Sequence, residues 1–291
     1  MKTQAAFRVT EITATHIQTI KELIAANPSW SRSRLSRELC QLWNWYSPLG
    51  QVKDIACRDL LLKLEQQGQI VLPRKLASAS QGGNRTFITP VPHATTAITG
   101  HLKDLLPLRV ELVESKHPSW PLFKYLLFRY HYLGFRGTVG ENMKYLVYDR
   151  YHRPLACFLF GSAAFSCAAR DNFIGWDQDT RLNNLCYLTN NTRLLILPWV
   201  QVPHLASHLL GLITRRIKGD WQQKYGHSLF LLETFVELNR FRGTCYRAAN
   251  WHYVGLTKGR SRNDRRHSLK VPLKAVYLYP LTKHLLRGEA L

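Results

Sequence analysis

Two unbroken apolar runs on either side of one long helical pattern constrain the fold of this chain more than any other feature. The runs are TRLLILPWV (192–200) and SLFLLETFV (228–236), and each has the length and composition of a buried strand. Residues 202–226 between them follow a helical pattern that ends at Gly226. When a helix connects two strands of one sheet, the chain crosses back over the sheet and the second strand runs parallel to the first. The order therefore predicts a βαβ unit with a parallel pair of strands.

The segments around this unit extend it to a mixed α/β domain over residues 101–291. An aromatic-rich helix is expected over 121–134, and the next two apolar runs are expected to form a hairpin around a turn at 150–153. After the βαβ unit come a short helix and further strands, an order that favours a sheet of parallel character. The elements that complete the predicted domain are strands at 143–149, 154–163, 253–257 and 274–280 and a short helix at 244–251.

The first 75 residues carry three short helical patterns followed by a strand pattern and a basic turn. This is the order of a winged helix-turn-helix domain, whose third helix enters the major groove of DNA while the wing contacts phosphates. The alternative is a plain three-helix bundle that contacts other proteins. The patterns span 16–26, 32–45, 54–68 and 69–75, and the residues expected to contact DNA are Arg58, Lys63, Arg74 and Lys75.

Residues 76–100 are rich in Ser, Thr, Gly and Pro and show no helical period, which indicates a linker. One short strand is expected inside this linker, at 86–88. The chain is therefore expected to divide into a winged-helix domain over 1–75, a linker over 76–100 and the α/β domain over 101–291.

The charge of the chain points to a polyanionic partner. Lys and Arg number 40 against 19 Asp and Glu, which gives a formal net charge of +21. Such an excess destabilises the compact state by self-repulsion, and the closely spaced phosphates of nucleic acid would neutralise it. A membrane surface is the rival partner, but the longest apolar stretches are broken by Arg or His and none is long enough to span a bilayer. DNA is therefore the expected partner, and no membrane association is expected.

The cysteines and the amino terminus indicate a reduced, cytoplasmic protein. The first residues, MKTQAAFRVTEITATH, lack the apolar segment of a signal peptide. The six cysteines are scattered and form no CxxC pair, which favours neither a zinc site nor a disulfide framework.

A second basic segment lies near the carboxyl terminus, in GLTKGRSRNDRRHSLK (255–270). Its Gly, Ser and Asn content predicts a loop, and its cations are expected to contact phosphates with little sequence preference. The alternative is a solvated basic run without a partner. The residues of this loop assigned to DNA binding are Lys258, Arg260, Arg262, Arg265 and Arg266.

Three carboxylates are the candidates for metal-dependent chemistry. Glu233 and Glu237 stand at even spacing in a strand, so both side chains are expected on one face, and Asp171 lies in ARDNFIGWD. Carboxylate oxygens are the ligands that Mg²⁺ or Mn²⁺ prefers, and such ions stabilise charge at phosphates. Asp171, Glu233 and Glu237 would together suit a nuclease or strand-transfer enzyme. The alternative is that Glu233 pairs with a buried arginine such as Arg170 or Arg247.

Tyr246 is the remaining candidate for a catalytic residue. A tyrosine can attack a phosphodiester or protonate a leaving group if a neighbour lowers its pKa from about 10, and Arg247 or His252 stands near enough in sequence to do so. The alternative is a structural tyrosine whose ring fills the core and whose hydroxyl has one fixed partner.

The order of elements and one local pattern resemble the carboxyl-terminal half of the GNAT-type N-acetyltransferase fold. Tyr246 precedes Asn250-Trp251 by four residues, as a tyrosine precedes a Gly-Phe pair in those enzymes. The resemblance implies a GNAT-like α/β domain after the winged helix. In the acetyltransferases a glycine-rich turn at a helix amino terminus holds the pyrophosphate of coenzyme A. Here WVQVPHLASH (199–208) has no glycine and places Val202-Pro203 in the turn, so acetyl-CoA is not expected as a cofactor.

A second resemblance covers most of the chain. The blocks RDNFIGWD, NNTRLLILPWVQVPHLASHLL, ETFVE, GTCYRAANW and GLTKGRSR are similar to the family that includes the Druantia anti-phage defence protein DruA, many of whose relatives are transposase-like. The resemblance implies an association with mobile DNA and phage defence.

These observations leave three hypotheses for the function. The first is a transposase-like or defence nuclease that cuts or joins DNA strands with some of Asp171, Glu233, Glu237 and Tyr246, and transposition-type chemistry would favour at least a homodimer. The second is a non-catalytic DNA-recognition subunit that recruits a helicase or nuclease partner. The third is an acyltransferase that acts on a basic or nucleic-acid-bound substrate.

Overall fold

The computed structural model describes residues 12–47, 50–73, 88–259 and 271–282, and the chain divides into two compact units, Met1–Arg85 and Thr86–Leu291. The division falls inside the segment that the sequence predicts as a linker. Each unit has a hydrophobic core of its own.

The first unit contains the three expected helices, α1 (Ala14–Ala26), α2 (Arg32–Leu42) and α3 (Asp54–Gln66). Apolar residues at helical spacing place one face of each helix in a common core, where Ile20, Leu39 and Leu61 are almost completely buried. The only extended pairing that the structure describes in this unit is an isolated antiparallel bridge between Tyr46 and Val52. Three helices are therefore confirmed, and the winged-helix assignment remains a prediction.

The strand expected over 69–75 is wrong for the part that the structure describes, residues 69–73. Side chains from the helices bind the backbone here and replace a partner strand. The Leu72 N–H donates to Glu65 Oε1 at 3.2 Å, and Arg32 Nε donates to the carbonyl of Pro73 at 2.8 Å. Leu72 is also buried in the helical core, which holds the segment against the helices.

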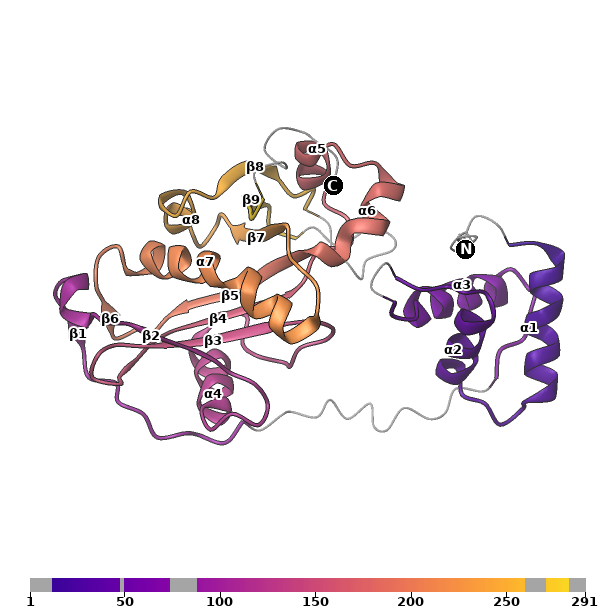
Figure 1. Ribbon diagram of the computed structural model, residues 1–291, viewed down its shortest axis with the longest axis horizontal. Helices are drawn as coiled ribbons and strands as arrows, with labels where there is room; N and C mark the ends of the chain where they lie inside the picture. Colours follow the sequence, from indigo (N-terminus) through magenta and orange to yellow (C-terminus); the bar gives the residue numbers. More distant parts are fainter. Residues whose placement is uncertain (1–11, 48–49, 74–87, 260–270, 283–291) are drawn as a thin grey trace. The chain divides into compact units, whose positions relative to one another are not determined.

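The second unit is built on a seven-stranded sheet with the strand order β2-β3-β4-β5-β7-β9-β8 (Figure 1). Only β5 and β7 pair in parallel, and the other neighbours are antiparallel. A small parallel sheet joins β1 to β6. The strands are β1 (Ile98–Thr99), β2 (Arg109–Leu112), β3 (Met143–Tyr148), β4 (Pro154–Ser162), β5 (Leu188–Ile196), β6 (Val200–Gln201), β7 (Leu231–Glu237), β8 (His252–Leu256) and β9 (Lys274–Pro280).

Two helices cover opposite faces of this sheet, α4 (Trp120–Tyr130) and α7 (Leu205–Tyr225) (Figure 1). Successive residues of a strand point to opposite faces, and two neighbours on β3 show which helix lies on which side. Lys144 lies over the ring of Trp120 on α4, whereas the hydroxyl of Tyr145 donates to Asp220 on α7 at 2.8 Å. β3 and β4 are therefore buried on both sides, which explains their nearly unbroken apolar sequences.

The predicted hairpin is confirmed as β3 and β4, and the βαβ unit is confirmed as β5, α7 and β7. The expectation of parallel character for the last strands is wrong. β9 pairs antiparallel with β7 along its whole length, from Leu231–Pro280 to Glu237–Lys274, and therefore occupies the sheet position beside β7. β8 joins the sheet only through β9.

Several helical segments complete the unit. The short helix expected over 244–251 is α8 (Thr244–Ala248). Two further helices that the sequence did not indicate lie between β4 and β5, α5 (Ala168–Ile174) and α6 (Gln178–Asn184). Single 3₁₀ turns are formed at Leu102–Leu105 and Leu185–Tyr187.

The second half of the predicted linker packs against the large unit. Ile98 is buried in its core and donates its N–H to the carbonyl of Trp199 at 2.8 Å, and the ring of His93 contacts that of Trp199. The strand expected at 86–88 is not formed at Ile88, and its first two residues lie outside the described part of the chain. No helix in the described residues is both long and apolar enough to cross a bilayer.

Candidate functional site

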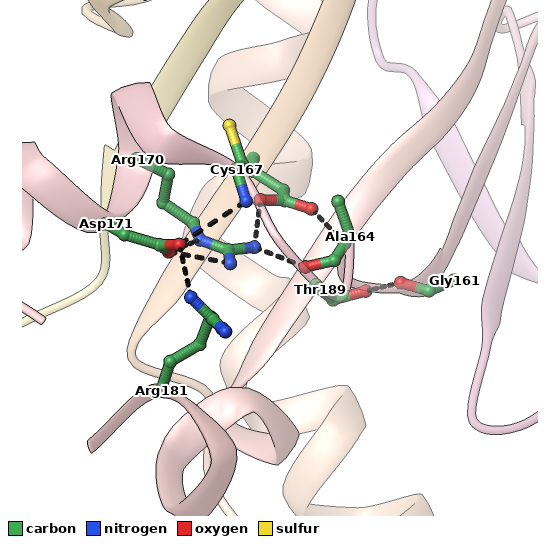
Figure 2. Close-up of polar contacts among 8 residues, drawn as sticks. Gly161, Ala164, Cys167, Arg170, Asp171, Arg181 and Thr189 are labelled. Carbon is green, nitrogen blue, oxygen red and sulfur yellow. Dashed lines mark hydrogen bonds and ion pairs between the residues drawn. The ribbon is translucent and has the colours of Figure 1, made fainter. Parts of the chain in front are cut away.

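Two of the predicted site carboxylates lie in one buried cluster around Arg170 on α5 (Figure 2). Arg170 Nη1 donates to Glu233 Oε2 at 2.8 Å, and Arg170 Nε donates to Asp171 Oδ1 at 2.8 Å. The side chains of Arg170 and Glu233 are both 0% exposed, so this ion pair is removed from solvent. The alternative that paired Glu233 with a buried arginine is therefore confirmed.

Backbone groups and a second arginine complete the cluster. Glu233 Oε1 accepts the N–H of Ala164 at 2.5 Å, and Arg170 Nη1 donates to the carbonyl of Ala164 at 2.7 Å. Asp171 Oδ2 accepts from Arg181 Nη1 at 3.2 Å (Figure 2). Two arginines thus balance two carboxylates, and together they connect α5, α6, β7 and the segment that follows β4.

The electrostatics of the cluster are those of a structural ion pair. Burial raises the pKa of Glu233, and the charge of Arg170 opposes this rise. Burial also disfavours the charged guanidinium of Arg170, but Glu233 and Asp171 raise its pKa above the ordinary value. Each charge in such a cluster is stabilised by its partner, so removal of one partner leaves the other buried and uncompensated.

Glu237 is the last residue of β7 and lies four residues beyond Glu233. In the register with β9, Glu233 stands opposite Leu278 whereas Glu237 stands opposite Lys274, and Glu237 Oε1 accepts from Arg240 Nε at 3.1 Å. Over the ranges that the structure describes, no three His, Cys, Asp or Glu side chains gather in a group that could hold a metal ion. The structure thus brings Asp171 and Glu233 together without Glu237. A Mg²⁺ or Mn²⁺ role for the three carboxylates remains a prediction, with no shared site to support it.

A cleft opens where β5 and β7 diverge. Their parallel pairing ends at Asn190–Glu233, and beyond this point the two strands line a cavity of about 450 Å³. The hydroxyl of Thr234 on β7 donates to the carbonyl of Asn191 on β5 at 3.0 Å, so a side chain joins the strands where their backbones separate. The end of α4, α8 with the segment that leads into it, and Ala206 on α7 line the rest of the cleft. Residues that define the cleft are Tyr132, Asn191, Thr234, Glu237, Phe241 and Tyr246.

Tyr246 lies in the wall of this cleft, away from the Arg170 cluster. Its hydroxyl donates to Asn191 Oδ1 at 2.7 Å, and its ring stacks on Tyr277 with 5.8 Å between the ring centroids. Burial raises the pKa of Tyr246, which keeps the hydroxyl protonated. Neither Arg247 nor His252 is among its hydrogen-bond partners in the described residues. The geometry is that of a structural tyrosine, and the catalytic role remains a prediction.

His131 lines the cleft, and Arg193 lies beside it. The pKa of His131 falls to about 4 because the ring is partly buried and, secondarily, because Arg193 is close. His131 Nδ1 accepts the N–H of Leu133 at 3.2 Å, so the proton of the neutral ring is carried on Nε2. Arg193 donates to the carbonyls of Gly134 and Thr192, and no carboxylate among the described residues forms an ion pair with it.

The residues predicted to contact DNA are only partly described. Arg58 on α3 pairs with Asp54 at 3.2 Å and is half exposed, and Lys63 on the same helix is exposed. Lys258 is exposed after β8. The remaining predicted contacts, Arg74, Lys75, Arg260, Arg262, Arg265 and Arg266, lie outside the described residues.

The cleft residues were largely missed by sequence reasoning. The strand predicted from the apolar run begins at Thr192 and excludes the preceding polar residue Asn191, although an Asn pair at the start of an apolar strand is an available signal. Arg193 stands inside the same run, whose composition predicts a buried strand. The rings of Tyr132 and Phe241 contact each other in the folded chain, with 5.4 Å between their centroids. The two residues are distant in sequence, so local sequence patterns do not predict this contact.

Comparison with family models identifies the family of this chain. A family model described as Druantia protein DruA matches residues 75–290. The chain belongs to the Druantia protein DruA family. The matched region includes both the Arg170 cluster and the cleft between β5 and β7. Membership in this family associates the chain with anti-phage defence.

Solved structures with a similar arrangement of elements are N-acetyltransferases. Spermidine N-acetyltransferase from Vibrio cholerae, solved with CoA and spermine, is 8% identical, with 61% of this chain and 98% of that chain covered and a TM-score of 0.39. A structure described as a putative phosphinothricin N-acetyltransferase is 14% identical, with 60% and 99% covered and a TM-score of 0.38. An N-acetyltransferase from Staphylococcus aureus Mu50 is 9% identical, with 60% and 97% covered and a TM-score of 0.35. No curated protein matches the chain.

Proposed function

We propose that this chain is a DNA-recognition component of an anti-phage defence system and that it binds DNA without cutting it. In this proposal a separate helicase or nuclease, recruited to the bound DNA, carries out the later steps. The formal net charge of +21 supports the choice of partner, because a protein of this charge gains affinity for DNA by releasing the counterions of the phosphates.

The observation that carries the choice of recognition over cleavage is the way Arg170 holds Asp171 and Glu233. A carboxylate that ligates a catalytic metal directs its oxygens to the ion, whereas the oxygens of Glu233 are directed to Arg170 and to the backbone N–H of Ala164. The cluster is neutral and buried, so it supports the junction of α5, α6 and β7. It does not present charge to a substrate.

The environment of Tyr246 also favours recognition over cleavage, because it does not support a covalent mechanism. A tyrosine nucleophile needs a neighbour that lowers its pKa, and the pKa of Tyr246 is instead raised by burial. Its hydroxyl proton is directed to Asn191 Oδ1, which is a hydrogen-bond acceptor and not a base strong enough to remove it.

The experiment combines binding and cleavage on the full chain. Fluorescence anisotropy with labelled single- and double-stranded DNA is expected to show binding in EDTA that Mg²⁺ or Mn²⁺ does not enhance. The same DNA incubated with either metal is expected to stay intact and to form no covalent adduct with the protein. Metal-dependent cleavage that is lost in Glu237→Gln, with binding retained, would establish the nuclease hypothesis in place of this proposal.

Glu237 is the variant of choice because its partner Arg240 is exposed, so the change does not strand a buried charge. Glu233→Gln would disturb the buried cluster and is interpretable only if the variant remains folded. An adduct that forms with wild type and is absent in Tyr246→Phe would identify a tyrosine nucleophile. Failure of wild type to bind any DNA would exclude recognition itself.

A further inference from the structure

The cleft between β5 and β7 combines aromatic walls with polar groups at fixed positions. Tyr132 and Phe241 stand at its mouth, where both rings are substantially exposed, at 39% and 49%. Tyr246 and Asn191 lie deeper, joined by the 2.7 Å hydrogen bond between them. A volume of about 450 Å³ lies within the range of roughly 300–1,000 Å³ that small-molecule sites occupy.

The surroundings of the mouth are cationic. The guanidinium of Arg240 lies over the ring of Tyr132 at 5.2 Å from its centroid, and Arg242 lines the cleft directly. Arg193 lies beside His131 but does not line the cleft itself, and its guanidinium donates to the carbonyls of Gly134 and Thr192. Glu237 is the carboxylate that lines the cleft, and its charge is balanced by Arg240.

We propose that this cleft receives one unpaired nucleobase of a bound DNA strand, with the neighbouring phosphates held by the arginines at the mouth. The inference rests on the proposed function and specifies how the large unit would engage DNA. A nucleobase has two flat apolar faces and a polar edge, so it requires stacking surfaces and hydrogen-bonding groups in one pocket. Tyr132 and Phe241 supply the rings.

The lining of the cleft also offers groups for the polar edge of the base. His131 Nδ1 is occupied by the N–H of Leu133, so Nε2 of the neutral ring is left as a donor. Thr244, an exposed residue at the start of α8, adds a hydroxyl that both donates and accepts. These groups suit a base edge and are few, so stacking is expected to contribute more than base identity.

The test compares DNA with and without bases on the full chain. Affinities are measured by anisotropy for a labelled single-stranded oligonucleotide and for an abasic strand of equal length, at one salt concentration. Phe241→Ala removes a stacking ring, and Ala206→Phe fills the cleft from α7. Because stacking of one base contributes about 1–3 kcal/mol, each variant is expected to bind the base-bearing strand about tenfold more weakly. Affinity for the abasic strand is expected to be unchanged.

Tyr151→Ala is the matched control. Its ring is 64% exposed and lies beneath the guanidinium groups of Arg150 and Arg153, but it lies outside the cleft. This variant is expected to bind both strands as wild type does. Circular dichroism confirms that each variant is folded before its affinity is interpreted.

The outcomes separate the inference from the proposed function. If wild type binds both strands and neither cleft variant changes the preference for bases, the cleft is not a base site while DNA recognition stands. If wild type binds no strand, both proposals fall. Acetyl-CoA is added as a competitor, and displacement of the base-bearing strand by it, with direct binding seen in calorimetry, would assign the cleft to the coenzyme instead.

Discussion

Arg170 determines what the two carboxylates beside it can do. Glu233 is completely buried at the centre of a sheet, where an unpaired charge would be very unfavourable, and its two oxygens are directed to Arg170 and to a backbone N–H. The same carboxylate on an open strand end would be available for a metal ion. The local environment, and not the residue type, therefore separates a structural acid from a catalytic one.

His131 provides a test of the electrostatics at the cleft. Its pKa is 6.5 in an ordinary environment and about 4 here, because burial and Arg193 disfavour the charged ring. Between these values the unfolded chain binds a proton that the folded chain does not, so stability falls as the pH is lowered from about 6.5 to about 4. Since the ring is only partly buried, the loss is expected to be about 1–2 kcal/mol after allowance for solvent screening.

Chemical denaturation of wild type and His131→Gln at several pH values measures this loss. The carboxylates titrate in both proteins, so the difference between the two curves isolates the histidine. The free energy of unfolding of wild type is expected to fall relative to that of the variant as the pH is lowered from about 6.5 to about 4, because only wild type carries the histidine. Parallel curves over the whole range would show that His131 titrates normally.

The residue-level alternatives could be formulated from the sequence but not decided by it. An acid in an apolar strand requires a partner, which is why Arg170 could be named for Glu233 in advance. The choice between an ion pair and a metal site depends on where Asp171 and Glu237 lie around Glu233, and this is set by contacts between distant segments. Arg193, beside the cleft residue His131, gives no signal in the sequence because its neighbours are those of a buried strand.

At the level of elements, the local sequence patterns predict where most helices and strands lie along the chain. They do not predict which strands pair with each other in the sheet. The apolar runs and the helix between them correctly predicted the parallel pair β5 and β7. β9 lies between β7 and β8 because it forms hydrogen bonds with β7, although the paired residues of β7 and β9 are more than 35 positions apart in the sequence. Hydrophobic periodicity and composition are local properties and do not predict such a pairing. α5 and α6 were not predicted because each has only 7 residues, which is too short to show a helical period.

The turn into α8 depends on Gly243. This residue has a φ of +68°, and a Cβ placed there would lie 2.6 Å from the hydroxyl of Tyr277 on β9. Gly243→Ala is therefore expected to lower stability by about 2–3 kcal/mol, through backbone strain and displacement of the tyrosine ring. The shift of the denaturation midpoint measures the effect.

Gly219 in the middle of α7 is the matched control, because a Cβ built there meets nothing within 4 Å apart from its chain neighbours and the backbone of its own helix. Gly219→Ala is expected to be neutral or to stabilise the chain by up to about 1 kcal/mol, since alanine favours a helix. If Gly243→Ala were as stable as the control, the turn would not need its left-handed conformation, and the wall of the cleft would be less fixed than the structure indicates.

At the scale of the whole molecule, the excess of positive charge is the property that most directly predicts behaviour in solution. Each phosphate neutralised on a duplex contributes about −0.9 to the slope of log affinity against log salt concentration. The basic segment 255–270 is the densest run of cations in the sequence, with Arg262, Arg265 and Arg266 within five residues. If these three contact phosphates, their replacement by Ser removes up to three contacts.

The slope for this triple variant is therefore expected to be less steep than that of wild type by up to about 2.7, with weaker binding that is uniform across DNA sequences. The control replaces Lys116, Arg136 and Arg150, which are exposed on the large unit and carry the same total charge. If specific contacts matter, the control keeps the wild-type slope, whereas equal changes in both variants would mean that net charge alone attracts the DNA. An unchanged slope in the first variant would leave the basic segment as a solvated run, and the phosphate contacts would have to be sought on α3 and at the mouth of the cleft.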